Sequence, residues 1–250
     1  RDRLRSRGLG DVYKRQLLRC LALVLVILVL ARPQTTNKWQ NSEIEGIDIM
    51  LAIDVSTSML AEDLKPNRLE AAKDVAAEFI NGRPNDNIGI TLFAGETFTQ
   101  CPLTVDHAVL LDMIHNIKCG LITDGTAVGM GIANAVTRLK DSKAKSKVII
   151  LLTDGTNNKG DISPMTAAEI AKSFGIRVYT IGVGTNGMAP YPYPVGNTVQ
   201  YVSMPVEIDE KTLTEIAGTT DGNYFRATSN SKLKEVYEEI DKLEKTKLNV

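Results

Sequence analysis

Short apolar runs alternate with amphipathic segments along most of this chain. The runs that are typical of buried strands lie at 47–53, 88–93, 148–152 and 178–183, with a weaker one at 224–226. Helical spacing of apolar residues occurs between them, at 69–80, 105–117, 127–139, 164–174 and 209–217, and finally at 231–244. Near-continuous apolar strands separated by helices indicate a parallel sheet covered on both faces. The pattern predicts a doubly wound α/β domain over residues 46–245.

The first 45 residues follow another pattern. Residues 1–16 carry six basic and two acidic side chains without apolar periodicity, and we interpret them as a non-native segment. Residues 17–32 are apolar apart from Arg19 and Arg32, and no polar face exists over 20–30. We therefore expect a membrane helix, truncated at its start because roughly 20 residues span a bilayer. A signal-peptide core and a soluble buried helix are the alternatives.

Residues 33–45 are expected to link this helix to the domain, and residues 246–250 to begin a C-terminal extension. The whole chain of 250 residues has 29 basic and 30 acidic side chains. Without residues 1–16 the balance is 23 against 28. An acidic excess disfavours binding to nucleic acid.

Three cysteines are too few for a disulfide scaffold, and no two of them form a C-x-x-C pair. We interpret Cys20, Cys101 and Cys119 as small apolar residues. A disulfide between Cys101 and Cys119 is the alternative in an oxidising compartment.

Polar residues follow two of the expected strands. The first strand ends in D-x-S-x-S, formed by Asp54, Ser56 and Ser58, and the strand at 148–152 is followed by Asp154. Ligands of doubly wound sheets collect at the carboxyl ends of strands, where the strand order reverses. If these strands flank that point, the two carboxylates face one another and repel unless a cation lies between them.

The residue types then indicate a metal. Carboxylate and hydroxyl oxygens suit Mg²⁺ or Mn²⁺, whereas Ca²⁺ is a poorer match, and Thr126 supplies a third hydroxyl before the helix at 127–139. Neutral hydroxyls leave much of the cation's charge uncancelled, so an open coordination position would favour an external carboxylate. Asp124 either supports the site from behind its ligands or is a simple turn carboxylate, and we favour the turn.

D-x-S-x-S, the downstream G-T and the strand-ending T-D-G resemble the metal-ion-dependent adhesion site of von Willebrand factor A domains, over residues 44–245. By that resemblance the sheet has six strands, mostly parallel, and Asp54, Ser56, Ser58, Thr126 and Asp154 hold the metal. The runs that narrow the match to BatA-type bacterial aerotolerance proteins are LARPQ, FAGETFTQCPLT, TDGTAVGMGIANAV, KSKVIILLTDG, IRVYTIGVGT and EIDKLEKTK. The resemblance implies an inner-membrane protein with a periplasmic domain, linked to sibling Bat proteins and a MoxR-type AAA+ ATPase.

Two segments are candidates for recognising a partner. Residues 184–205 hold four of the nine prolines and predict a long surface loop or a small hairpin. The segment 96–102 is expected to flank the site. A formal G-x-G-x-x-G at 182–187 is not expected to bind a dinucleotide, because no helix follows it.

Two other functions compete with metal-dependent protein binding. A phosphoryl-transfer enzyme of the haloacid-dehalogenase type would use Asp54 as nucleophile. Such enzymes share a D-x-D pattern in which the second Asp is the acid/base, but this chain has Ser56 at that position. His107 and His115 fall on one helix away from the strand ends and are expected at the surface. The third function is a structural membrane module with a vestigial site. We favour a binding module over an enzyme.

Overall fold

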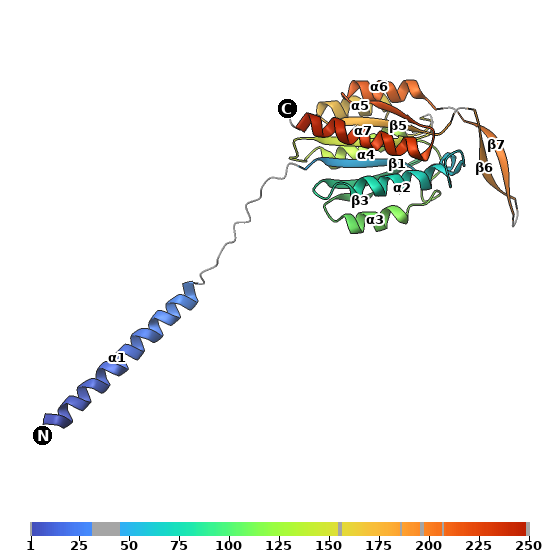
Figure 1. Cartoon of the computed structure of the whole chain (residues 1–250). Coiled ribbons are helices and arrows are strands. Elements are labelled where there is room, and N and C mark those ends of the chain that lie inside the picture. The colour runs from blue at the N-terminus through green and yellow to red at the C-terminus, as the bar shows by residue number, and fades with distance from the viewer. Residues whose placement is uncertain are drawn as a thin grey trace. The chain divides into compact units, whose positions relative to one another are not determined.

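The structure is a computed structural model that describes residues 2–31, 46–154, 157–185, 187–195, 198–206 and 208–248. The chain divides into two compact units, Arg1–Ser42 and Glu43–Val250 (Figure 1). The boundaries predicted within them, including the linker at 33–45, stay predictions. All of the residues 33–45 lie outside the described part of the chain, which resumes at Gly46.

The part of the first unit that the structure describes is one helix, α1 (Asp2–Ala31). Among the described residues, no helix is both long enough and apolar enough to cross a membrane. The membrane helix expected at 17–32 is therefore not supported. Its apolar stretch between Leu17 and Ala31 is interrupted by Arg19 and is shorter than the roughly 20 residues that a bilayer requires.

The second unit is built on a six-stranded sheet with the order β3-β2-β1-β4-β5-β8. Its strands are β1 (Asp48–Asp54), β2 (Asn87–Phe93), β3 (Thr97–Thr104), β4 (Lys147–Thr153), β5 (Arg177–Val183) and β8 (Tyr224–Ala227). All neighbouring pairs are parallel except β2 and β3, which are antiparallel. The predicted mostly parallel, six-stranded, doubly wound sheet is confirmed.

Helices cover both faces of this sheet (Figure 1). They are α2 (Arg68–Asn81), α3 (His107–His115), α4 (Val128–Leu139), α5 (Pro164–Ser173), α6 (Glu210–Thr219) and α7 (Asn230–Leu248). Alternate residues of β1 point to opposite faces. Ile49 and Leu51 pack in a core with α2, α3 and α7, whereas Met50 and Ala52 pack in a second core with α4, α5 and α6. Burial on both faces explains why β1 is apolar at nearly every position.

The sheet order reverses between β1 and β4. From β1 the chain continues to β2 on one side, and from β4 it continues to β5 on the other. The carboxyl ends of β1 and β4 therefore form the switch point at which doubly wound sheets bind ligands. This position was predicted, and the parallel register that pairs Ile53 with Leu152 confirms it.

A separate antiparallel hairpin consists of β6 (Gly187–Val195) and β7 (Thr198–Val206). It follows β5 and extends from the carboxyl end of the main sheet (Figure 1). Of the two forms predicted for 184–205, the hairpin is correct. Because β6 and not a helix follows Gly184, the G-x-G-x-x-G run lacks the helix N-terminus that a pyrophosphate would need.

Candidate metal centre

Asp54 and Asp154 lie side by side at the ends of neighbouring strands. Asp54 is the last residue of β1 and is 0% exposed, and Asp154 follows β4 and is 2% exposed. One carboxylate oxygen of Asp54 accepts a hydrogen bond from the Ser56 N–H at 2.9 Å, and the other accepts from the Thr153 hydroxyl at 2.7 Å. These bonds fix the carboxylate at the switch point.

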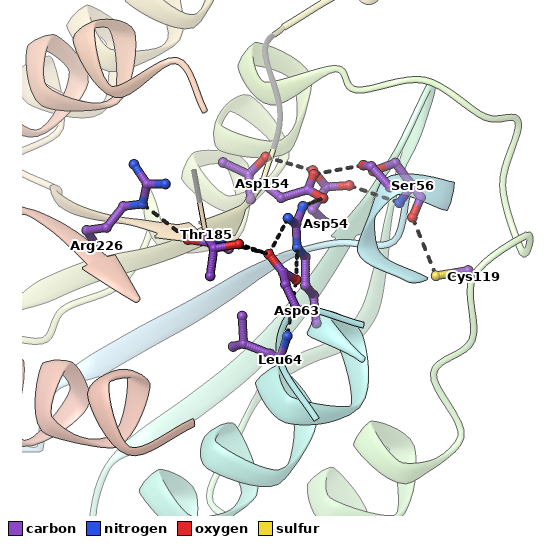
Figure 2. Close-up of polar contacts among 12 residues, drawn as sticks. Asp54, Ser56, Asp63, Leu64, Cys119, Asp154, Thr185 and Arg226 are labelled. Atoms are coloured by element: carbon purple, nitrogen blue, oxygen red, sulfur yellow. Dashed lines mark hydrogen bonds and ion pairs between the residues drawn. The ribbon is translucent and has the colours of Figure 1, made fainter. Parts of the chain in front are cut away.

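Two serine hydroxyls join the carboxylates. Ser56 precedes a short 3₁₀ helix, η1 (Thr57–Leu60), and its extended backbone turns the chain back over the strand end. The Ser56 and Ser58 hydroxyl oxygens lie 2.9 Å apart, and the Ser58 hydroxyl donates to Asp154 Oδ1 at 2.8 Å. Figure 2 shows Asp54, Ser56 and Asp154 close to one another at this site.

Thr126 approaches from the loop before α4. Its N–H donates to Asn158 Oδ1 at 2.8 Å, and its carbonyl accepts from the Asn158 N–H at 2.9 Å. Thr126 is buried and lines a cavity of about 380 Å³ together with Ser58 and Asp154. The structure thus gathers all five predicted residues at one place, and Asn158, which the sequence did not single out, holds Thr126 there.

The two buried carboxylates repel one another. Burial, followed by the charge of Asp154, raises the pKa of Asp54 to about 7. Burial also raises the pKa of Asp154, although Arg68 and Ser58 act in the opposite direction. A cation between the carboxylates would relieve both effects.

The donor set fits a hard divalent cation. It offers two carboxylates and three hydroxyls, which are all oxygen donors. Within the described ranges, no cluster of three or more His, Cys, Asp or Glu side chains could hold a metal, so a nitrogen or sulfur site for zinc or copper is not found there.

Arg68 also joins the candidate site, although the sequence pattern did not predict it there. Its guanidinium is 1% exposed and donates from Nη1 to Asp154 Oδ2 at 2.6 Å. Its other nitrogens donate to both oxygens of Asp63, at 2.7 and 2.6 Å. Burial lowers the pKa of Arg68, but its bonds to the two carboxylates outweigh that effect and raise the pKa. Arg68 therefore neutralises part of the site's negative charge.

Asp63 extends this contact to the base of the hairpin. One of its oxygens accepts from the N–H and the hydroxyl of Thr185, at 2.8 and 3.1 Å (Figure 2). Gly184 makes room for the arrangement, since a side chain there would begin 2.6 Å from Arg68 Nη2. Hydrogen bonds thus connect Asp154 to Arg68, Arg68 to Asp63, and Asp63 to Thr185, which precedes β6.

Asp124 is more than the turn residue that was predicted. Its carboxylate accepts from the N–H and the hydroxyl of Thr57, at 3.0 and 2.9 Å, across 67 positions of sequence. This contact ties the loop before Thr126 to η1. The contact favours support of the site over the simple turn, because the partner Thr57 lies between Ser56 and Ser58 at the start of η1.

The cysteines and histidines take no part in this donor set. Cys20, Cys101 and Cys119 are free, so the alternative of a Cys101–Cys119 disulfide is wrong, and Cys119 donates to the Ser56 carbonyl at 3.4 Å. His115 is exposed on α3, as predicted. His107 is half-buried, with a ring nitrogen 3.0 Å from the Asp86 carbonyl.

Residues 48–239 match the family model of the von Willebrand factor type A domain. The chain belongs to this family. The match covers every strand of the main sheet and all five residues of the candidate site. The chain spans about two thirds of the length of the curated bacterial relatives that it matches.

Solved structures place this von Willebrand factor type A domain among bacterial relatives. The protein BatB of Bacteroides thetaiotaomicron has 35% sequence identity and a TM-score of 0.71, covering 80% of this chain and 100% of that one. An aerotolerance-related membrane protein of Bacteroides fragilis has 34% identity and a TM-score of 0.68, covering 79% and 100%. The resemblance to bacterial aerotolerance proteins is thus supported at the level of the domain.

A third neighbour bears on the metal. Proximal thread matrix protein 1 from the mussel byssus has 25% identity and a TM-score of 0.63, and its structure holds zinc in the metal-ion-dependent adhesion site (MIDAS) motif. It covers 79% of this chain and 45% of its own. A metal-occupied adhesion motif therefore occurs on this fold in a relative.

Proposed function

We propose that this chain is a BatA-like protein-binding module whose Asp54, Ser56, Ser58, Thr126 and Asp154 hold Mg²⁺ or Mn²⁺. When bound, the cation supplies an electrophilic position that an Asp or Glu of a partner protein can fill. The protein residues orient the donors, and the cavity beside them admits the partner's side chain.

One observation carries this proposal. Asp54 and Asp154 are buried together, and the three hydroxyl-bearing residues converge on them at the switch point of the sheet. Two carboxylates buried together are costly without positive charge, and of these two Arg68 contacts Asp154 and not Asp54. Asp54 is therefore the group that gains most from a cation.

Phosphoryl transfer by Asp54 is the weaker alternative. A haloacid-dehalogenase-like mechanism needs an acid/base two residues after the nucleophile, and Ser56 stands there with its hydroxyl 2.9 Å from that of Ser58. A vestigial site in a purely structural module predicts no metal response at all. Measurement of metal binding therefore distinguishes a vestigial site from the metal-binding site that we propose.

The proposed partners are proteins that present Asp or Glu, among them sibling Bat proteins and the MoxR-type AAA+ ATPase system. The Bacteroides fragilis neighbour is an aerotolerance-related membrane protein, which supports membrane association of this chain. We propose the bacterial inner membrane, with the domain in the periplasm. Protease treatment of spheroplasts tests this topology, because a periplasmic domain is cut and a cytoplasmic one is protected.

The test of the function is isothermal calorimetry of the full chain with Mg²⁺ and Mn²⁺. We expect one site per chain. The absence of both heat and a thermal shift at millimolar metal would refute it. Partner capture from membranes, with Mg²⁺ or with EDTA, then tests whether recognition needs the metal.

A further inference from the structure

The hairpin of β6 and β7 has prolines at every second position of one strand. Because proline has no N–H, it cannot donate a hydrogen bond across the ladder. In an antiparallel pair, positions alternate between hydrogen-bonded and non-hydrogen-bonded. The prolines therefore occupy non-hydrogen-bonded pairs, which are Pro190 with Ser203, Pro192 with Tyr201 and Pro194 with Val199. The backbone groups of these six residues point away from the ladder, toward the hairpin's two outer edges.

The outer edge of β6 is closed to further pairing. Its prolines offer no donor, and the Pro190 carbonyl already accepts from the Glu62 N–H at 2.9 Å. This contact confirms that the Pro190 backbone faces outward. An edge without donors cannot build a β-ladder with another chain.

The outer edge of β7 has the opposite character. Tyr201 and Ser203 direct both N–H and C=O outward and are exposed, and no backbone hydrogen bond reaches them from elsewhere in the described residues. Pro205 closes the edge only at its end nearest Val206. Such an edge is a template for an extended chain.

The same hairpin covers the metal centre. Ala189, Tyr191 and Met204 line the cavity that also contains Ser58 and Asp154. Register and strand alternation place these three side chains on one face of the hairpin, together with Val202. A strand added beside β7 would lie about 4.8 Å away, so its side chains on that face would reach the rim of the cavity.

We propose that β7 receives an extended segment of a partner protein, which pairs with its outer edge and turns one Asp or Glu side chain into the cavity. Val202 and Met204 are exposed beside this path. The partner residues two positions before and after the acidic one share its face of the strand, so we expect them to be apolar. The inference rests on the proposed function, because the metal centre supplies the reason for the acidic residue. It adds the partner's conformation and the apolar neighbours.

The test uses the full chain with Mg²⁺ and a capped synthetic peptide of alternating Val and Thr with one central Asp. Two further peptides carry Asn in place of Asp, or N-methyl groups on alternate backbone nitrogens. We expect the Asp peptide to bind and to slow amide exchange at Tyr201 and Ser203. The Asn peptide should bind less tightly, and the methylated peptide should leave exchange unchanged.

A pair of variants isolates the edge. Ser203→Pro removes the outward N–H but keeps the β6–β7 ladder, as Pro205 does two positions later. Loss of one main-chain hydrogen bond should weaken the Asp peptide about threefold to tenfold. Ser203→Ala removes only the hydroxyl and should bind as the unaltered chain does. Calorimetric metal binding should be the same in both variants.

Each outcome decides between the inference and the function on which it rests. Peptide binding that needs Mg²⁺ but is unaffected by Ser203→Pro would overturn pairing along β7 and leave the function standing. Binding that Ser203→Pro weakens and EDTA does not would support the edge and count against the metal. A dimer of the chain that Ser203→Pro dissociates would overturn the inference, since a second copy would then occupy the edge.

Discussion

Arg68 Nη1 lies 2.6 Å from Asp154 Oδ2, with both side chains buried. The pair places a permanent positive charge directly against one of the five candidate metal ligands. The remaining Asp154 oxygen accepts from Ser58, so the two oxygens of one carboxylate face different partners. Arg68 thereby leaves Oδ1 on the side of the hydroxyls, where the metal is proposed to bind.

Arg68→Met should destabilise the domain. It removes the charge that compensates Asp63 and Asp154, and breaking a buried ion pair by deleting one partner costs about 3–5 kcal/mol. Mg²⁺ should then raise the unfolding midpoint more in this variant than in the unaltered chain, because the cation replaces part of the lost charge. Lys73→Met, on the same helix but paired with Glu70, is the control and should not enlarge the metal response.

Asp54→Asn should abolish the metal response while leaving the metal-free domain at least as stable. The substitution removes a ligand charge and also the repulsion with Asp154. Thermal unfolding with and without Mg²⁺ measures both effects. The exposed Asp161→Asn serves as control and should keep the full metal shift. A metal-linked shift that survives in Asp54→Asn would argue that the cation binds elsewhere.

Thr126→Ala should weaken metal binding on the order of tenfold without unfolding the domain. The hydroxyl-bearing side chain lines the cavity, whereas the contacts of Thr126 with Asn158 use its backbone and survive the substitution. Calorimetry gives the affinity and urea unfolding the stability. Thr123→Ala, in the same loop but exposed, should change neither. Partner recovery that is equal with Mg²⁺ and EDTA in both proteins would mean that the metal does not mediate recognition.

The sequence predicted the strands that are buried on both faces and missed the strand that is not. β1, β2, β4 and β5 are nearly continuous apolar runs, which is the pattern that such burial produces. In β3 only Cys101 is buried, so this antiparallel edge strand carries a weak signal. The segment 96–102, expected to flank the site, falls largely within it.

The candidate site shows the same division. D-x-S-x-S and T-D-G are local patterns, so the five predicted residues could be found without a structure. Arg68 could not, because its partner Asp154 lies 86 positions away and nothing in the helix that begins at Arg68 distinguishes it from a surface residue. The conformation of 184–205 stayed open for another reason, since alternate prolines normally argue against a strand.

Acid should weaken the packing of α7 through Glu244. This buried carboxylate accepts from Arg177, from the Tyr179 hydroxyl at 2.6 Å and from the Ser146 hydroxyl at 2.7 Å. Burial acts to raise the pKa of Glu244, but these bonds outweigh burial and hold the pKa below its ordinary value of 4.5. A lowered folded-state pKa means that the stabilisation is complete above pH 4.5 and is lost as the pH falls through the folded-state pKa.

Glu244→Gln should therefore lower the free energy of unfolding at pH 7 by about 1.5–3 kcal/mol, the usual size for hydrogen bonds to a charged group. Between pH 5 and pH 3 the unaltered chain should lose stability more steeply than the variant, because only the carboxylate can take up a proton there. Urea unfolding at several pH values measures both slopes. Glu239→Gln changes an exposed residue of the same helix and should follow the unaltered chain. Parallel slopes for Glu244→Gln and the unaltered chain would show that Glu244 does not link α7 to the sheet through its charge.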